Sequence, residues 1–350
     1  MRRLVPALLL AVSGCGGAVM SGMDASQELD AGSDAQVPFD AGAGSDASVD
    51  AGGDAGVDAG TDAGTDPGFD GGADAGVSTP DAGSWRSSLA VCWTDASCQR
   101  VMAIGHGGAW TSSIPYNSNG AIAAAYTQGL DGVKIDVRVT ADNVPVISHS
   151  SPIELFESLD CYNQRIENMT AAQVTNCHRV PSTTERFQRL DEVLDYLRGK
   201  LVVQLCVKVA SDLPRVVQQV IASNAQDFAF LEIDPIDLQT RVPSTAGGNT
   251  VWYLINLASD LTQVDTLLAL NNPRAFMYEF DTGVQLGNLV STRLHPANVR
   301  AFTYESGALA TTQQLVGYYD AGYDVVSANA TSALLPARQQ VNGARGVSPP

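Results

Sequence analysis

Basic residues are scarce in this sequence, in which 20 Lys and Arg stand against 38 Asp and Glu for a formal net charge of −18. Residues 16–84 contain no Lys or Arg, and their thirteen Asp and one Glu contribute −14. Arg2 and Arg3 add two positive charges, which leaves −6 for residues 85–350. Because nucleic-acid-binding proteins concentrate basic charge on one surface, this balance excludes nucleic acid as a partner.

Long hydrophobic runs are absent after the N-terminus, and the run found there is short. The chain begins MRRLVPALLLAVSGC, with two Arg, an apolar stretch from Leu4 to Val12 and small residues before Cys15. This order is typical of a signal peptide, and the apolar stretch is too short to span a bilayer. The letters VSGC resemble a bacterial lipobox, in which cleavage precedes the cysteine and the thiol receives lipid.

From these residues we expect a signal peptide over residues 1–15 and an exported lipoprotein that is anchored to a membrane through Cys15. An ordinary secretory signal that contains a cysteine is the alternative. Gly16 stands where an aspartate would favour retention in the inner membrane. We therefore expect the outer membrane or the cell surface of a Gram-negative bacterium.

Residues 16–84 have almost nothing to bury. A D-A-G triplet recurs there, as in DAGGDAGVDAGTDAGTDPG. Self-repelling charge and the lack of apolar residues predict a disordered, extended linker. Gly is not kept at every third position and proline is scarce, which excludes a collagen helix. We expect one folded domain over residues 85–345, and we expect it to be a monomer.

Six cysteines are present, one of them at the lipobox. Cys92 with Cys98, and Cys161 with Cys177, are each close in sequence and lie in polar, loop-like stretches. Because export permits disulfides, we expect these two pairs to be bonded. We expect Cys206, inside the apolar run LVVQLCVKV, to be reduced and buried. The absence of CxxC and HxxxH spacings disfavours a zinc site.

Short β-branched runs alternate with helical patterns from residue 100 onward. The expected strands are 101–106, 132–139, 200–208, 228–233, 251–256, 275–280, 299–304 and 323–328. The expected helices are 118–129, 187–198, 211–223, 260–270 and 311–321. An additional strand at 144–149 follows the turn-like ADN and predicts a hairpin beside the second strand. The pattern predicts an α/β fold, the (β/α)8 TIM barrel, with a small hairpin insertion after the second strand.

Polar residues recur on one face of the expected strands. Residues two apart in a strand share a face, so Lys134, Asp136 and Arg138 lie together. On the third strand the same spacing groups Gln204, Cys206 and Lys208. Later strands end in polar residues near the same rim, namely Glu232, Asn256, Glu279, Glu305 and Asn329. Since the active sites of barrels lie at the C-terminal ends of the strands, these residues predict an active site there.

A motif of three segments carries a family resemblance. HGG at 106–108, PYNS at 115–118 and GLDGVKIDVRVTADNVPVISHS at 129–150 resemble, in order and spacing, the opening motif of the glycerophosphodiester phosphodiesterase family. FQRLDEVLDYL, VRAFTY and AGYDVVSAN resemble its later helix and strands. The resemblance covers nearly all of residues 100–330 and is most specific in the first fifty. It implies a divergent member of the phospholipase-C-like phosphodiesterase TIM-barrel superfamily.

The resemblance implies a phosphodiester hydrolase that acts on glycerophosphodiesters or phospholipid head groups. In that family two histidines serve as acid and base, and their positions match His106 and His149. Such a reaction must protonate a leaving alkoxide, deprotonate an attacking oxygen and stabilise phosphoryl charge. We expect His106, His149 and Lys134 to be catalytic. The residues expected to bind substrate are Asn117, Arg138, Lys208 and Trp110.

The resemblance fails at the metal site. The family usually holds a divalent cation with Glu-x-Asp on the second strand and Glu on the third, where this chain has Lys134, Asp136 and Cys206. Magnesium and calcium need several oxygen ligands, and an ammonium repels them. We therefore expect either no cofactor or Mg²⁺ or Ca²⁺ at a degenerate site, with Asp136 as the remaining ligand. Lys134 and Lys208, and also Arg138, would then offset phosphoryl charge.

Two other departures leave alternatives open. Gly107 stands where the family has Arg, and Ser150 where it has Asp. One alternative is a barrel that has lost catalysis and serves as a surface binding lipoprotein, with Lys134 only a member of a buried ion pair. Another is a carbohydrate hydrolase with Glu232 and Glu279 as paired carboxylates, which leaves the phosphodiesterase motif unexplained.

Overall fold

A computed structural model describes residues 92–347 of the chain. The expected signal peptide, the lipidation site at Cys15 and the linker over residues 16–84 lie outside these residues. The expected domain of residues 85–345 is described from residue 92. Within the part that is described, none of the helices is both long enough and apolar enough to cross a membrane.

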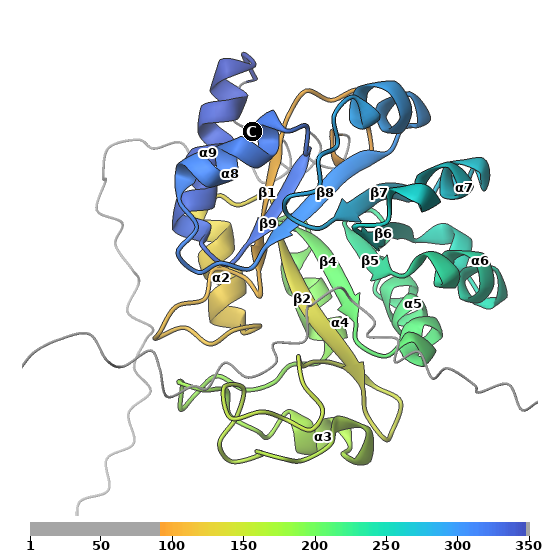
Figure 1. The fold of residues 1–350 in the computed structure, drawn as a ribbon. Coiled ribbons are helices and arrows are strands. Elements are labelled where there is room, and N and C mark those ends of the chain that lie inside the picture. The colour runs from red at the N-terminus through yellow and green to blue at the C-terminus, as the bar shows by residue number, and fades with distance from the viewer. Residues whose placement is uncertain (1–91, 348–350) are drawn as a thin grey trace, which may run out of the picture. The chain divides into compact units, whose positions relative to one another are not determined.

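Eight parallel strands close into a barrel (Figure 1). They are β1 (Met102–His106), β2 (Gly132–Val139), β4 (Val202–Val207), β5 (Ala229–Ile233), β6 (Trp252–Ala258), β7 (Ala275–Phe280), β8 (Arg300–Glu305) and β9 (Val325–Ala328). β1 pairs with both β9 and β2 and so closes the wall. The predicted (β/α)8 TIM barrel is confirmed, and each predicted strand lies within two residues of its expected ends.

Helices connect the strands and surround the barrel (Figure 1). They are α2 (Asn119–Gln128), α4 (Leu190–Leu197), α5 (Leu213–Ala222), α6 (Pro235–Ser244), α7 (Val264–Ala269), α8 (Thr312–Asp320) and α9 (Thr331–Ala344). Shorter turns are η1 (Ile166–Asn168), η2 (Ala210–Asp212), η3 (Gly248–Thr250), η4 (Leu261–Gln263), the π-helical η5 (Val290–Leu294) and η6 (His295–Ala297). Helices α6 and α9 are not among those expected from the sequence, because Pro243 and Pro336 lie inside them and proline signals a helix break.

An insertion follows β2. β3 (Pro145–Ile147) pairs antiparallel with β2, which confirms the predicted hairpin. The chain then forms η1 and α3 (Ala171–Val174) around a small core of its own before it enters α4. In Figure 1, α3 lies beyond the tip of the β2 arrow. The insertion therefore lies at the C-terminal end of the barrel strands.

The barrel interior and the space between strands and helices hold separate apolar clusters. Inside the barrel, Trp93 is 1% exposed and packs against the rings of Phe230 and Phe276, with centroids 4.6 and 4.9 Å away. Both phenylalanines lie near the N-terminal starts of their strands. The apolar plug thus fills that end of the barrel, and the polar residues are left at the other.

Both predicted disulfides are confirmed, since Cys92 is bonded to Cys98 and Cys161 to Cys177. Cys206 is 1% exposed, as expected of a residue in an apolar strand. The expectation that it is reduced is wrong, because it is disulfide-bonded and no described cysteine is free. An apolar strand context indicates burial, but it does not indicate the redox state of the thiol.

Candidate active site

His106 ends β1 at the C-terminal mouth of the barrel. Its Nδ1 lies 2.9 Å from Oδ1 of Asn329, and the amide nitrogen of Asn329 donates to the carbonyl of Ser306 at 2.8 Å. Because an amide oxygen only accepts, this hydrogen bond assigns the proton to Nδ1 and leaves Nε2 basic. The ring of Tyr304 stacks on the imidazole at 4.2 Å between centroids. The imidazole is therefore held in one plane and one tautomer.

His149 reaches the same mouth from the segment that follows β3. Its carbonyl accepts from Nε and Nη2 of Arg138 at 3.1 and 2.9 Å, and its N–H donates to Glu157 at 2.7 Å. Its Nδ1 is buried and has no hydrogen-bond partner within residues 92–347. Arg138, which we expected to bind substrate, thus holds the backbone of His149.

Burial lowers the pKa of both histidines. The pKa of His106 lies well below its usual value, first because of burial and then because of the nearby ammonium of Lys134. Burial also lowers the pKa of His149, and the carboxylate of Asp136 partly opposes that shift. Both imidazoles are therefore neutral at pH 7, the form in which a histidine accepts a proton.

The buried carboxylate of Glu157, which is not among the site residues expected from the sequence, holds the His149 segment in place. Glu157 is 2% exposed, and it accepts from the N–H of Ser150 at 2.8 Å and from its hydroxyl at 2.5 Å. The guanidinium of Arg179 lies 4.0 Å from Glu157 and donates to the carbonyl of Ile147 at 2.6 Å. These contacts explain Ser150, because an aspartate there would face the carboxylate of Glu157. No local sequence signal separates Glu157 from the other charged residues of this loop.

Asp136 is the centre of the polar cluster in the barrel mouth and is fully buried. Its Oδ1 forms ion pairs with Lys134 and, at 2.9 Å, with Lys208. Its Oδ2 accepts from the hydroxyl of Tyr116 at 2.9 Å and from the amide of Asn117 at 2.8 Å. Each carboxylate oxygen therefore has two donors.

The donor set around Asp136 does not fit a divalent cation. Such a cation needs several oxygen ligands, whereas both oxygens of Asp136 are engaged and two ammonium groups adjoin them. Across residues 92–347, no three His, Cys, Asp or Glu side chains are grouped so that they could hold a metal. Burial by itself raises the pKa of Asp136, but Lys134 and Lys208 together hold it well below its usual value. Asp136 is thus an ionised partner of two lysines.

Tyr116 lies between the two histidines. Its ring centroid is 5.5 Å from that of His106 and 6.0 Å from that of His149, and its hydroxyl lies 3.4 Å from both ring nitrogens of His106. A Cβ on Gly107 would lie 1.9 Å from the Tyr116 ring, and Gly107 has φ +69°, which favours glycine. The tyrosine ring thus fills the space that a side chain at residue 107 would take, and this explains the absence of the family's Arg.

Trp110 and Asn117, which we expected to bind substrate, are hydrogen-bonded to His106 and to Asp136, respectively. The indole of Trp110 donates to the carbonyl of His106 at 3.0 Å. Asn117 is fully buried with φ 56°. Its amide nitrogen donates to Asp136, and its Oδ1 has no partner in the described part of the chain. Trp110 therefore supports the backbone of His106, and the Oδ1 of Asn117 is available to a bound donor.

The remaining polar strand ends divide between the inside and the outside of the barrel. Glu232 accepts from the amides of Gln204 at 2.9 Å and Asn256 at 3.3 Å. Burial, and then the charge of Glu232, raise the pKa of Glu279 well above its usual value. Glu305, expected near the same rim, instead accepts from a tyrosine hydroxyl on α8 and does not join the cluster. The outward turn of Glu305 follows from its place one residue beyond the inward-facing Tyr304.

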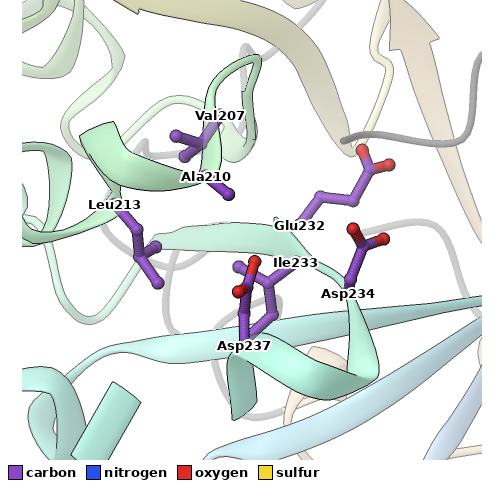
Figure 2. A pocket seen from close by; sticks show the side chains of 7 residues that line it. All are labelled: Val207, Ala210, Leu213, Glu232, Ile233, Asp234 and Asp237. Carbon is purple, nitrogen blue, oxygen red and sulfur yellow. The ribbon is translucent and has the colours of Figure 1, made fainter. Parts of the chain in front are cut away.

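A hollow beside this cluster opens at the ends of β4 and β5 (Figure 2). It is lined by Val207, Ala210, Leu213, Glu232, Ile233, Asp234 and Asp237. Figure 2 shows the carboxylates of Glu232 and Asp234 on the same side of the hollow. Burial, followed by the charges of Asp237 and Glu232, raises the pKa of Asp234. Because clustered carboxylates repel an anion, this hollow does not suit a phosphodiester.

Fold and site together define a class of protein. The (β/α)8 barrel carries two histidines of lowered pKa and two lysines at its C-terminal mouth. This arrangement suits acid–base chemistry on an anionic substrate. Residues 105–251 match the model of the glycerophosphoryl diester phosphodiesterase family. This segment runs from the end of β1 to the residue before β6 and includes His106 and His149, and over this length the chain is similar to that family.

Solved structures share this fold. A glycerophosphodiester phosphodiesterase from Agrobacterium tumefaciens is 18% identical at a TM-score of 0.54, over 67% of this chain and 99% of its own. A glycerophosphoryl diester phosphodiesterase from Parabacteroides distasonis is 16% identical at a TM-score of 0.57, over 74% of this chain and 92% of its own. A phosphodiesterase from Oleispira antarctica, in complex with the product sn-glycerol-3-phosphate, is 15% identical at a TM-score of 0.54, over 72% of this chain and 99% of its own. No curated protein matches this chain.

Proposed function

We propose that this barrel hydrolyses phosphodiesters with His106 and His149 as its acid–base pair, and that Lys134 and Lys208 take the role that a divalent cation has in the family. The observation that carries the proposal is the convergence on Tyr116 and Asp136. The ring of Tyr116 contacts both imidazoles, its hydroxyl bonds Asp136, and Asp136 holds both ammonium groups.

The proposed reaction moves one proton at each histidine. Nε2 of His106 takes the proton of the attacking oxygen, from water or from a neighbouring substrate hydroxyl, as that oxygen bonds to phosphorus. The bond between phosphorus and the leaving oxygen breaks, and the imidazolium form of His149, which is populated below its lowered pKa, gives its proton to that oxygen. The ammonium groups donate to the non-bridging oxygens and stabilise their charge. In this proposal Arg138 and Glu157 act as positioning residues, because they hold the backbone of His149.

Glycerophosphodiesters and phospholipid head groups are the substrates we propose. The Oleispira antarctica neighbour holds sn-glycerol-3-phosphate as its product, which supports a glycerol-containing phosphodiester. The buried Oδ1 of Asn117 and Nδ1 of His149 lack partners among the described residues. A hydroxyl-bearing substrate could hydrogen-bond such atoms, and a buried polar atom gains from being bonded.

A second function is a barrel without catalysis that binds its ligand as a surface lipoprotein. One observation favours it: Lys134 is already paired with Asp136. Lys208 and Glu232 lie inside the same barrel as Lys134 and Asp136. The formal charges of the two lysines and the two carboxylates sum to zero. The lysines would then serve as members of a buried ion-pair network.

We also propose export as a lipoprotein with lipid on Cys15, attachment to the outer membrane or cell surface, and a monomeric domain. Labelling with a fatty acid in the native host would detect the lipid, and Cys15→Ala should abolish it. Sedimentation of the unlipidated chain would give its mass in solution.

The test of catalysis is turnover of a panel of glycerophosphodiesters and phospholipids by the full chain, with and without a chelator. We expect turnover that the chelator does not change and that His106→Ala or His149→Ala reduces at least a hundredfold, the usual contribution of an acid or base. His178→Ala is the matched control, because His178 lies in the exposed insertion and pairs with Asp160. Absence of turnover across the panel would support the binding protein, and loss of turnover with the chelator would refute the role of the lysines.

A further inference from the structure

Exposed large apolar side chains are distributed unevenly over this domain. Ten are found in the described part of the chain. Eight of them follow the C-terminal ends of barrel strands, on loops or in the first residues of the next helical element, namely Leu155, Phe156, Leu159, Tyr162, Val209, Ile236, Leu261 and Leu309. We call these eight the apolar ring. The other two, Tyr126 and Leu270, lie on α2 and directly after α7.

One member of the apolar ring adjoins the proposed active site. Phe156 is 46% exposed, yet its ring centroid lies 5.6 Å from that of His149 and 6.4 Å from that of Tyr116. Five separate connections contribute to the ring: the insertion after β2 and the segments that follow β4, β5, β6 and β8. Exposed apolar side chains therefore occur on five of the connections at the C-terminal side of the barrel, where the proposed active site lies.

The densest part of the apolar ring lies on a stiff support. Leu159 is 70% exposed and Leu155 is 53% exposed, while Ile153 and Ile166 on either side are buried in the core of the insertion. The disulfide between Cys161 and Cys177 ties the same segment to the residues just after α3. The segment thus has an apolar core available and still directs four large apolar side chains outward, as interaction surfaces do.

We propose that the apolar ring docks on a lipid surface, so that the barrel mouth faces the lipid and takes its phosphodiester substrate from there. The choice of substrate rests on the function proposed above; the docking itself does not. A protein that covered all five loops would close the mouth, whereas a lipid layer both covers the ring and supplies the head group. Interfacial proteins bind by inserting such side chains into the boundary between head groups and acyl chains.

The charge of the domain selects the kind of lipid. Residues 85–350 carry a net charge of −6, so anionic lipids repel the domain at long range. Insertion of apolar side chains needs no lipid charge. We therefore expect binding to uncharged phosphatidylcholine vesicles, and weaker binding when an anionic lipid is added.

The experiment is co-sedimentation of the full chain, produced without lipid modification, with phosphatidylcholine vesicles. We expect the double variant Leu155→Ser/Leu159→Ser to partition at least about tenfold more weakly, because each leucine loses the gain from burial of its side chain. Leu270→Ser is the matched control, an exposed leucine away from the mouth, and should bind like the parent. His106→Ala should also bind like the parent, which separates docking from catalysis.

Four results would overturn the docking proposal: no sedimentation of the parent, equal loss in Leu270→Ser, binding that requires anionic lipid, or a dimer in solution that the double variant dissociates. The last result would assign the apolar ring to a second copy of the chain. If vesicle binding behaves as expected and no phosphodiester is turned over, the docking proposal stands and the proposed catalysis fails.

Discussion

Two lysines share the carboxylate of Asp136, so loss of that carboxylate should lower the free energy of unfolding more than loss of either lysine. Asp136 is fully buried, and the side chains of Lys134 and Lys208 are 7% and 12% exposed. Asp136→Asn leaves two ammonium groups in the barrel without their carboxylate and sets an amide N–H₂ among donors. Removal of one partner from a buried ion pair costs about 3–5 kcal/mol, and we expect this substitution to fall in that range.

Lys134→Met should lower the free energy of unfolding less than Asp136→Asn does. It leaves Asp136 paired with Lys208 at 2.9 Å and bonded to Tyr116 and Asn117. Burial already lowers the pKa of Lys134, so the protein recovers part of the cost of burying that charge. We expect a loss of unfolding free energy below about 2 kcal/mol, in the range of one hydrogen bond to a charged group.

Urea unfolding of the full chain, with disulfides intact, measures both values by linear extrapolation. Lys200→Met is the control, because Lys200 lies against the ring of Tyr196 away from the mouth. The rate of turnover distinguishes a catalytic role of Lys134 from a role in stability alone. If Lys134 stabilises the phosphoryl charge, Lys134→Met should lose at least about tenfold in rate, which corresponds to about 1.4 kcal/mol, while it remains folded. A Lys134→Met variant as unstable as Asp136→Asn would refute the shared-carboxylate reasoning.

Three further predictions concern other parts of the domain. Glu157→Gln should lower the unfolding free energy by about 2–4 kcal/mol, because it leaves Arg179 buried without its carboxylate; an unchanged urea midpoint would contradict this. Trp93→Ala should cost about 3–5 kcal/mol through the cavity that it leaves, and a thermal unfolding curve like that of the parent would show that the plug is dispensable. The proposed reaction needs His106 neutral, so the pH must lie above the lowered pKa of His106. It also needs His149 protonated, so the pH must lie below the lowered pKa of His149. The pH profile of kcat/KM should therefore be a bell with its optimum below pH 6.5, and an alkaline optimum would reverse the assignment.

Much of this protein follows from the sequence alone, because the signals are local. The strands are readable because each is a short β-branched run, and the hairpin of β2 and β3 because the turn residues lie between two such runs. Cys92 and Cys98, and Cys161 and Cys177, are near enough in sequence to suggest their pairing. The positions of His106 and His149 follow from the order and spacing of a motif, and the loss of metal ligands follows from Lys134 and Cys206.

The tertiary structure decided what depends on residues distant in the chain. Glu157 and Arg179 look like ordinary loop charges in sequence, and only the folded insertion brings them to the backbone of His149. Gly107 is explained only by the ring of Tyr116 above it. Lys134 lies on β2 and Lys208 directly follows the neighbouring strand β4, so the arrangement of one carboxylate with four donors cannot be read from either segment alone. Through-space electrostatics and packing, which have no sequence period, set these features.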